Sequence, residues 1–226
     1  MSARPVILVH GMGSSFEHNW VMPGWRDLLS EAGRTVLGVE LPGHGKSAQA
    51  ADRETAGLIE DEARKAAGVD AVGFSAGANA LLVAASRSPE LFARIAVLGV
   101  GDRSLSENGP RGSDWRPSFA AALESGDEPG PGMPLMIRRL ARSAGNDLHT
   151  VAAYIRSTQP APVLADLAHI TARCLVVEGG ADPAGPAEQL AEVIPDCRRV
   201  VLKGVDHFAI PSDFGCIDAV LRFLDD

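Results

Sequence analysis

One serine of this sequence stands in a context typical of a catalytic nucleophile. Ser75 is the centre of the segment Gly-Phe-Ser-Ala-Gly at 73–77, between apolar runs at 69–72 and 78–85. The first run predicts a short buried strand, and the second predicts a helix packed into a core. The flanking glycines lack Cβ atoms, so strand and helix can approach closely around a sharp turn. Such a turn holds a serine hydroxyl out above the sheet edge, where it can attack a substrate.

Two residues near the C-terminus have the types needed to activate a serine hydroxyl. Asp182 follows an apolar strand expected at 173–178, and His207 follows a strand expected at 198–202. A serine becomes a strong nucleophile when an imidazole takes its proton and a carboxylate fixes the tautomer of that imidazole. Asp182 and His207 are candidates for these two roles beside Ser75.

A glycine-rich turn follows the first apolar strand of the chain. Residues 6–9 are Val-Ile-Leu-Val, and residues 10–15 are His-Gly-Met-Gly-Ser-Ser. Backbone N–H groups in such a turn can converge on one point and bind the oxyanion that forms during acyl transfer. We predict an oxyanion hole made by the amides of Met12 and of Ala76, the residue directly after the serine.

Taken together, these segments resemble the α/β-hydrolase family. The matching motifs are the His-Gly turn at 10–11, the Pro-Gly-His-Gly-Lys-Ser loop at 42–47 and the Gly-x-Ser-x-Gly elbow at 73–77. The resemblance covers the chain from about residue 5 to the C-terminus, apart from a divergent insert. It implies an α/β-hydrolase fold in which the acid and the base follow the nucleophile in the order Ser, Asp, His. On that order Ser75 attacks, His207 transfers the proton and Asp182 orients the histidine.

The acid of the triad has more than one candidate. Asp182 matches the Gly-x-x-Asp motif of the family. Asp102 follows the strand expected at 94–100, and some members of the family draw their acid from that strand end. Asp206 adjoins His207 and is too close in sequence to orient it comfortably. We favour Asp182 and keep Asp102 as the alternative.

The alternation of strand and helix signals predicts the fold class. Strand signals recur near residues 6–9, 35–39, 69–74, 94–100, 173–178 and 198–202. Helical stretches separate most of them, which is typical of an α/β domain with a mainly parallel sheet and helices on both faces. The first hairpin usual in the family is missing, so we expect about six strands, within one domain over residues 1–226.

A long segment between the fourth and fifth strands predicts a cap. We assign the insert to about 103–168, with short helices at 115–123, 135–143 and 148–157. The Gly- and Pro-rich stretch at 125–134 excludes regular structure and favours a loop that can move as a lid. In the family an insert at this place covers the nucleophile, so we expect a small helical cap. A surface excursion with no role in binding is the alternative.

The residues beside the catalytic segments indicate the substrate. Phe74 and Phe208 are apolar and adjoin Ser75 and His207, so we expect them to line the substrate pocket. The predicted function is cleavage of a small carboxylic ester, with an apolar acyl or aromatic group, or of a thioester or lactone, through an acyl-enzyme. A serine rather than an aspartate in the elbow disfavours haloalkane dehalogenase and epoxide hydrolase chemistry. Amidase and carbon–carbon hydrolase activities stay open. A lyase that uses the triad as acid and base, and a small-molecule receptor, are the alternatives from other classes.

Composition excludes several other classes of protein. The chain has 226 residues, 46% of them hydrophobic, and its mean hydropathy is near zero, which is typical of one globular core. The formal net charge of −8 disfavours nucleic acid or an anionic membrane as a partner. We expect a small-molecule substrate as the partner.

The histidines and cysteines bear on loop structure, metal binding and cellular location. His10 and His44 are expected to fix their loops through hydrogen bonds. No pair of the six histidines has metal-ligand spacing, so we predict no metal and no cofactor. Three widely spaced cysteines, no CxxC pair and no signal peptide favour reduced thiols and a cytoplasmic location.

Overall fold

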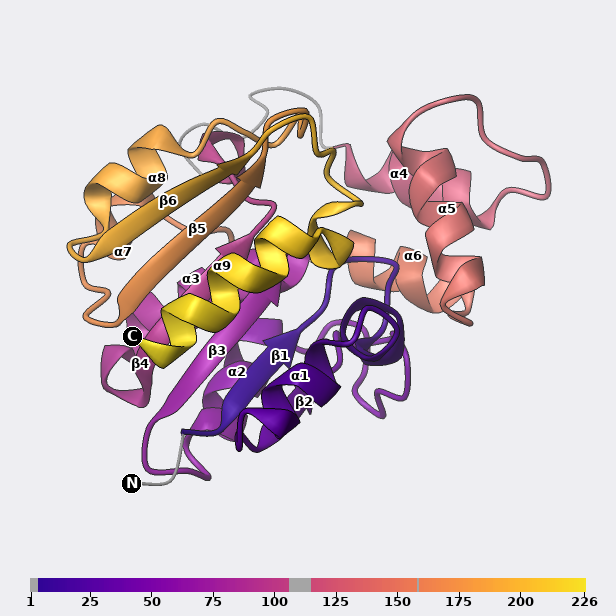
Figure 1. Cartoon of the computed structure of the whole chain (residues 1–226). Coiled ribbons are helices and arrows are strands. Elements are labelled where there is room, and N and C mark those ends of the chain that lie inside the picture. Colours follow the sequence, from indigo (N-terminus) through magenta and orange to yellow (C-terminus); the bar gives the residue numbers. More distant parts are fainter. Residues whose placement is uncertain (1–3, 106–114, 158) are drawn as a thin grey trace.

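The protein is built around a six-stranded sheet in which every neighbouring pair of strands is parallel (Figure 1). The computed structural model describes residues 4–105, 115–157 and 159–226. The strands are β1 (Val6–Val9), β2 (Val36–Val39), β3 (Val69–Phe74), β4 (Phe92–Leu98), β5 (Arg173–Gly179) and β6 (Cys197–Leu202). Their order across the sheet is β2-β1-β3-β4-β5-β6. The predicted α/β fold with a parallel sheet of six strands is therefore confirmed.

Helices cover both faces of the sheet, and the central strands are therefore buried on both sides (Figure 1). Alternate residues of β1 point to opposite faces, with Ile7 in one apolar core and Leu8 in the other. The helices of the Leu8 face are α1 (Trp25–Glu31) and α9 (Phe214–Asp225). Those of the Ile7 face are α2 (Thr55–Ala63), α3 (Ala76–Arg87), α7 (Leu164–Leu167) and α8 (Glu188–Val193). Short helical turns occupy Glu17–Val21, Pro89–Leu91, Asp102–Ser104 and Ile210–Ser212.

Three further helices lie to one side of the sheet layers (Figure 1). They are α4 (Arg116–Glu124), α5 (Met133–Ser143) and α6 (Leu148–Arg156), close to the three helices predicted there. The exclusion of regular structure over 125–134 is wrong at its end, because α5 begins at Met133 and proline is tolerated in a first helical turn. The three helices share a small apolar core of their own, which Met12 and Phe208 contact from the sheet domain. Residues 106–114 and 158 of the expected insert lie outside the described residues. Within the described ranges, no helix is both long and apolar enough to span a bilayer.

The turn from β3 into α3 is the most constrained point of the backbone. Ser75 has φ 52° and ψ −114° and is the only non-glycine residue with positive φ in the described part of the chain. A Cβ added to Gly77 would lie 2.5 Å from the carbonyl oxygens of both Val9 and His10. The first turn of α3 therefore packs directly on the end of β1, and only glycine fits between them.

We expect Gly77→Ala to destabilise the protein, because backbone atoms at 2.5 Å cannot move away as a flexible side chain would. The predicted loss in free energy of unfolding is about 2–3 kcal/mol. Gly57→Ala is the matched control, because Gly57 lies inside α2 with nothing within 4 Å of an added Cβ. That change should instead stabilise by about 0.5–1 kcal/mol through helix propensity. Urea unfolding checks both, and equal stability of the two variants would contradict the packing argument.

Candidate active site

Three side chains from distant parts of the chain form a hydrogen-bonded row. The Nε2 atom of His207 lies 3.0 Å from Ser75 Oγ, and its Nδ1 atom lies 2.8 Å from Asp182 Oδ2. The Asp182 carboxylate is almost fully buried, and the His207 side chain retains 15% of its exposure. A buried carboxylate that accepts from Nδ1–H leaves Nε2 as the acceptor facing the serine hydroxyl. The structure thus brings together the serine, histidine and aspartate singled out from the sequence.

The loops after β5 and β6 hold the acid and the base of this row. Asp182 follows β5, and its second oxygen, Oδ1, accepts a hydrogen bond of 2.8 Å from the amide of Ala184. His207 follows β6 beside a turn in which Asp206 Oδ1 accepts from the amides of Phe208 and Ala209. The carboxyl ends of parallel strands lie on one edge of the sheet, so residues far apart in sequence meet there.

The alternative acid has other partners. Asp102 Oδ1 accepts from the amide of Leu190 at 3.0 Å, and its Oδ2 accepts from the amide of Gln189 at 3.2 Å. Both amides belong to the first turn of α8, where a carboxylate is favoured by the helix dipole. Asp102 therefore anchors a helix N-terminus, and its carboxylate is bonded there and not to His207.

The two predicted oxyanion donors lie on either side of the serine. Met12 belongs to the turn after β1, and Ala76 is the first residue of α3. Within the described residues neither backbone amide donates a hydrogen bond to another backbone group. Free N–H groups at a helix N-terminus and in a glycine turn are suited to bind an oxyanion, and both residues line the same cavity as Ser75.

A cavity of about 530 Å³ opens at Ser75. Its apolar wall is made by Met12, Ala56, Ala80, Ile155, Ala161 and Pro162. Polar groups are contributed by Asn79, Ser104, Arg116, Tyr154, Ser157 and Gln159. Among the described residues that line it, neither His207 nor the predicted pocket residues Phe74 and Phe208 occur. Both phenyl rings instead contact the His207 imidazole, with centroids 5.1 and 5.3 Å away.

His44 fixes the turn that carries Met12. Its Nδ1–H donates to the carbonyl of Pro42 at 2.9 Å, so its Nε2 accepts from the amide of Gly13 at 3.0 Å. Burial lowers the pKa of His44 to about 3, and repulsion from His10 acts in the same direction. The imidazole therefore stays neutral at ordinary pH and keeps its acceptor nitrogen. The prediction that this histidine fixes its loop is supported by these contacts.

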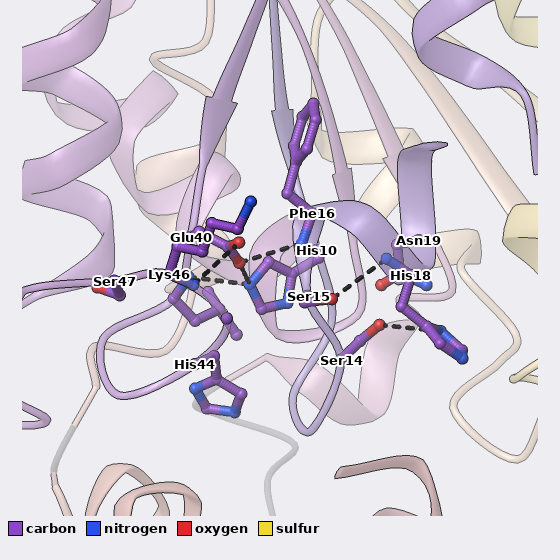
Figure 2. Close-up of polar contacts among 12 residues, drawn as sticks. His10, Ser14, Ser15, Phe16, His18, Asn19, Glu40, His44, Lys46 and Ser47 are labelled. Carbon is purple, nitrogen blue, oxygen red and sulfur yellow. Dashed lines mark hydrogen bonds and ion pairs between the residues drawn. The ribbon is translucent and has the colours of Figure 1, made fainter. Parts of the chain in front are cut away.

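Glu40 and His10 join the same turn to the loop after β2 (Figure 2). Glu40 Oε2 lies 2.8 Å from His10 Nε2 and accepts from the amide of Phe16 at 3.0 Å. Burial acts to raise the pKa of Glu40, but the hydrogen bond and charge of His10 and the amides of Phe16 and Lys46 outweigh it and lower that pKa. A carboxylate with these partners stays ionised and ties three segments together.

Comparison with protein families decides the classification. A family model described as the alpha/beta hydrolase family matches residues 6–214. The chain belongs to this family. No match was found among curated protein sequences.

Solved structures share the fold of this α/β hydrolase at low sequence identity. The enol-lactonase from Burkholderia xenovorans LB400 is 19% identical with a TM-score of 0.75, covering 100% of this chain and 93% of that one. A bromoperoxidase from Bacillus anthracis is 22% identical, with a TM-score of 0.76 and coverage of 99% and 92%. A thermophilic esterase from Thermogutta terrifontis is 20% identical, with a TM-score of 0.74 and coverage of 99% and 90%.

Sequence reasoning missed one residue that holds the glycine turn of this α/β hydrolase. Asn146, between α5 and α6, donates through Nδ2 to the carbonyls of Gly13 and Ser14 at 2.9 and 2.8 Å. Its Oδ1 accepts from the amide of Gly45 at 2.7 Å. A single asparagine thus joins the segment of α4–α6 to the turn that carries Met12. Nothing in the local sequence marks it, because its partners lie about a hundred residues away.

We expect Asn146→Ala to slow the reaction of Ser75 with a fluorophosphonate by about 10- to 100-fold, because a displaced oxyanion turn no longer meets the reagent's phosphoryl oxygen. Asn146→Asp should be slower still, because its carboxylate would face the Gly13 and Ser14 carbonyls. Labelling followed by mass spectrometry gives the rates.

Thr150→Ala is the control for that experiment. Thr150 Oγ1 donates to the carbonyl of Gly43, so it also links α6 to the sheet domain, but it does not touch the glycine turn. Equal slowing by Thr150→Ala and Asn146→Ala would mean that loosening of the helices, and not the position of the turn, controls the rate.

Proposed function

We propose that this α/β hydrolase is a serine hydrolase that cleaves a small carboxylic ester through an acyl-enzyme on Ser75. The observation that carries the proposal is the row from Ser75 Oγ to His207 Nε2 and from His207 Nδ1 to Asp182, at 3.0 and 2.8 Å. A serine, an imidazole and a buried carboxylate in this order are the parts needed for nucleophilic catalysis by a hydroxyl. Ser75, at one end of the row, lines a cavity large enough for a small ester.

In the first half of the reaction Ser75 Oγ attacks the ester carbonyl carbon while His207 Nε2 takes the hydroxyl proton. The carbonyl oxygen becomes an oxyanion and accepts hydrogen bonds from the amides of Met12 and Ala76. His207 then gives its proton to the leaving oxygen, the C–O bond breaks and the alcohol departs. Asp182 keeps the imidazole in the required tautomer and stabilises its charged form.

The cavity takes the acyl side of the ester in this proposal. His207 must reach the leaving oxygen, yet it is not among the described residues that line the cavity, whereas Met12, Ser75 and Ala76 are. The leaving group therefore extends toward His207, and the acyl chain extends along α3 into the cavity. Water activated by His207 then attacks the acyl-enzyme and releases the carboxylic acid.

The similar structures indicate which substrates to test first. They include an enol-lactonase and a thermophilic esterase, and both names describe cleavage of an ester bond. The apolar wall of the cavity favours an apolar acyl group over a sugar or a phosphate. Simple esters with acyl chains of graded length are therefore the appropriate probes.

Steady-state hydrolysis of p-nitrophenyl acetate, butyrate and octanoate by the wild type and Ser75→Ala tests the proposal. The wild type should turn over many times, and the substitution should lower kcat by about a million-fold, because the nucleophile is lost. Equal rates for the two proteins would remove the acyl-enzyme mechanism. Turnover that stops after one equivalent, or none at all, would favour a receptor or a lyase.

Replacing each aspartate in turn tests the assignment of the acid. Asp182→Asn should lower kcat by about 10⁴-fold, because an amide no longer holds the Nδ1–H tautomer of His207. Asp102→Asn should leave the row intact and act on stability, since it weakens the carboxylate contacts at the start of α8. We expect a loss of about 1 kcal/mol in urea unfolding for that variant. The opposite pattern of kcat would make Asp102 the acid.

A further inference from the structure

One polar group on the cavity wall has no partner in the protein. The Asn79 side chain lines the cavity of Ser75, and its Oδ1 atom is buried without a hydrogen-bond partner among the described residues. Of the side chains with such an orphaned atom in the described ranges, Asn79 is the one that lines this cavity. A buried polar atom left unpaired opposes folding, so its presence calls for an explanation outside the fold.

Two other polar side chains on this wall, Ser157 and Gln159, are already paired within the protein. Ser157 Oγ donates to the carbonyl of Tyr154 at 2.6 Å and lies 3.1 Å from Gln159 Nε2, which donates to it. Gln159 also accepts from the amide of Thr55 at 3.0 Å and donates to the carbonyl of Arg53 at 3.1 Å. These two groups shape the wall, whereas the Asn79 side chain lines the cavity with its Oδ1 atom buried and unpaired, so a ligand would meet the carboxamide after the amide plane rotates.

We propose that Asn79 is a specificity-determining residue that selects acyl groups with a hydroxyl on the third carbon. The proposal rests on the proposed function for the orientation of the ester in the cavity. A carboxamide presents a donor on one side and an acceptor on the other, and rotation of the amide plane exchanges them. A hydroxyl both donates and accepts, so it pairs with either end, whereas an alkyl group pairs with neither.

The position of Asn79 on α3 sets the place of that hydroxyl. Asn79 stands four residues after Ser75, and the amide of Asn79 donates to the Ser75 carbonyl at 3.0 Å in the first helical turn. With a rise of about 1.5 Å per residue the two residues are about 6 Å apart along the axis. An acyl chain that leaves Ser75 Oγ and runs along α3 therefore passes Asn79 within its first few carbons, and in our proposal the hydroxyl is on the third of them.

A matched pair of esters tests the proposal. p-Nitrophenyl 3-hydroxybutyrate and p-nitrophenyl 3-methylbutyrate have the same shape and differ by a hydroxyl in place of a methyl group. The kcat/KM of each ester is divided by the rate constant of its hydrolysis by hydroxide, which corrects for intrinsic reactivity. On this scale we expect the wild type to favour the hydroxy ester at least about tenfold. The corresponding amides, 3-hydroxybutyramide and 3-methylbutyramide, measure binding to Ser75→Ala by calorimetry.

Two variants separate a role in recognition from a role in the fold. Asn79→Leu keeps the size of the side chain and removes its polar atoms, so the preference for the hydroxy ester should fall to about one or below. Its Tm should rise by about 2–4 °C, because the orphaned oxygen is gone. Ser157→Ala changes a polar lining residue whose bonds are internal, and it should keep the hydroxy-to-methyl ratio of the wild type.

The outcomes distinguish this inference from the proposed function. Equal rates for the two esters, a preference that survives Asn79→Leu, or a fall in Tm of Asn79→Leu with the ratio unchanged would each overturn the role of Asn79. Hydrolysis that does not depend on Ser75 would make the esterase proposal fail. The recognition role would still stand if 3-hydroxybutyramide binds Ser75→Ala more tightly than 3-methylbutyramide does, and if adding Asn79→Leu to Ser75→Ala abolishes that difference.

Discussion

The contact between the first turn of α3 and the end of β1 is the constraint on which the whole site depends. Gly77 lies against the carbonyls of Val9 and His10, where no Cβ fits. This approach sets the distance between the Ser75 turn and the turn that carries Met12, since each turn continues directly from one of the two packed elements. The left-handed backbone of Ser75 follows from the same geometry, because strand and helix must reverse direction within one residue.

Much of the fold could be predicted because a buried parallel strand is a short apolar run and a tight turn needs glycine. Those two signals locate β1 and β3 at their observed bounds and place Ser75 between strand and helix. Strand ends are less exact: β4 spans Phe92–Leu98 instead of the expected 94–100, because an apolar run alone does not mark where a strand starts or stops. The family motifs added the order of the acid and the base.

The rest of the site depends on contacts that no local pattern encodes. Asp182 and Asp102 both follow apolar strands, and only the packing of α8 shows that Asp102 is bonded to that helix. Asn146 acts on a turn more than 130 residues away, and an asparagine between two helices is ordinary in sequence. Asn79 lies in an apolar helix where a lone amide carries no periodic signal. Such roles emerge when the partners of each polar atom are traced in three dimensions.

The polar groups around Ser75 divide into two kinds, and the division indicates their roles. Those that hold the glycine turn, His44 and Asn146, find partners for the ring nitrogens and amide atoms they present. Within the described ranges, the amides of Met12 and Ala76 find no backbone acceptor, and Asn79 Oδ1 finds no donor. Natural proteins leave buried polar groups unpaired at a cost in stability. In our proposals a substrate supplies the missing partners of the unpaired groups beside Ser75, which offsets that cost when it binds.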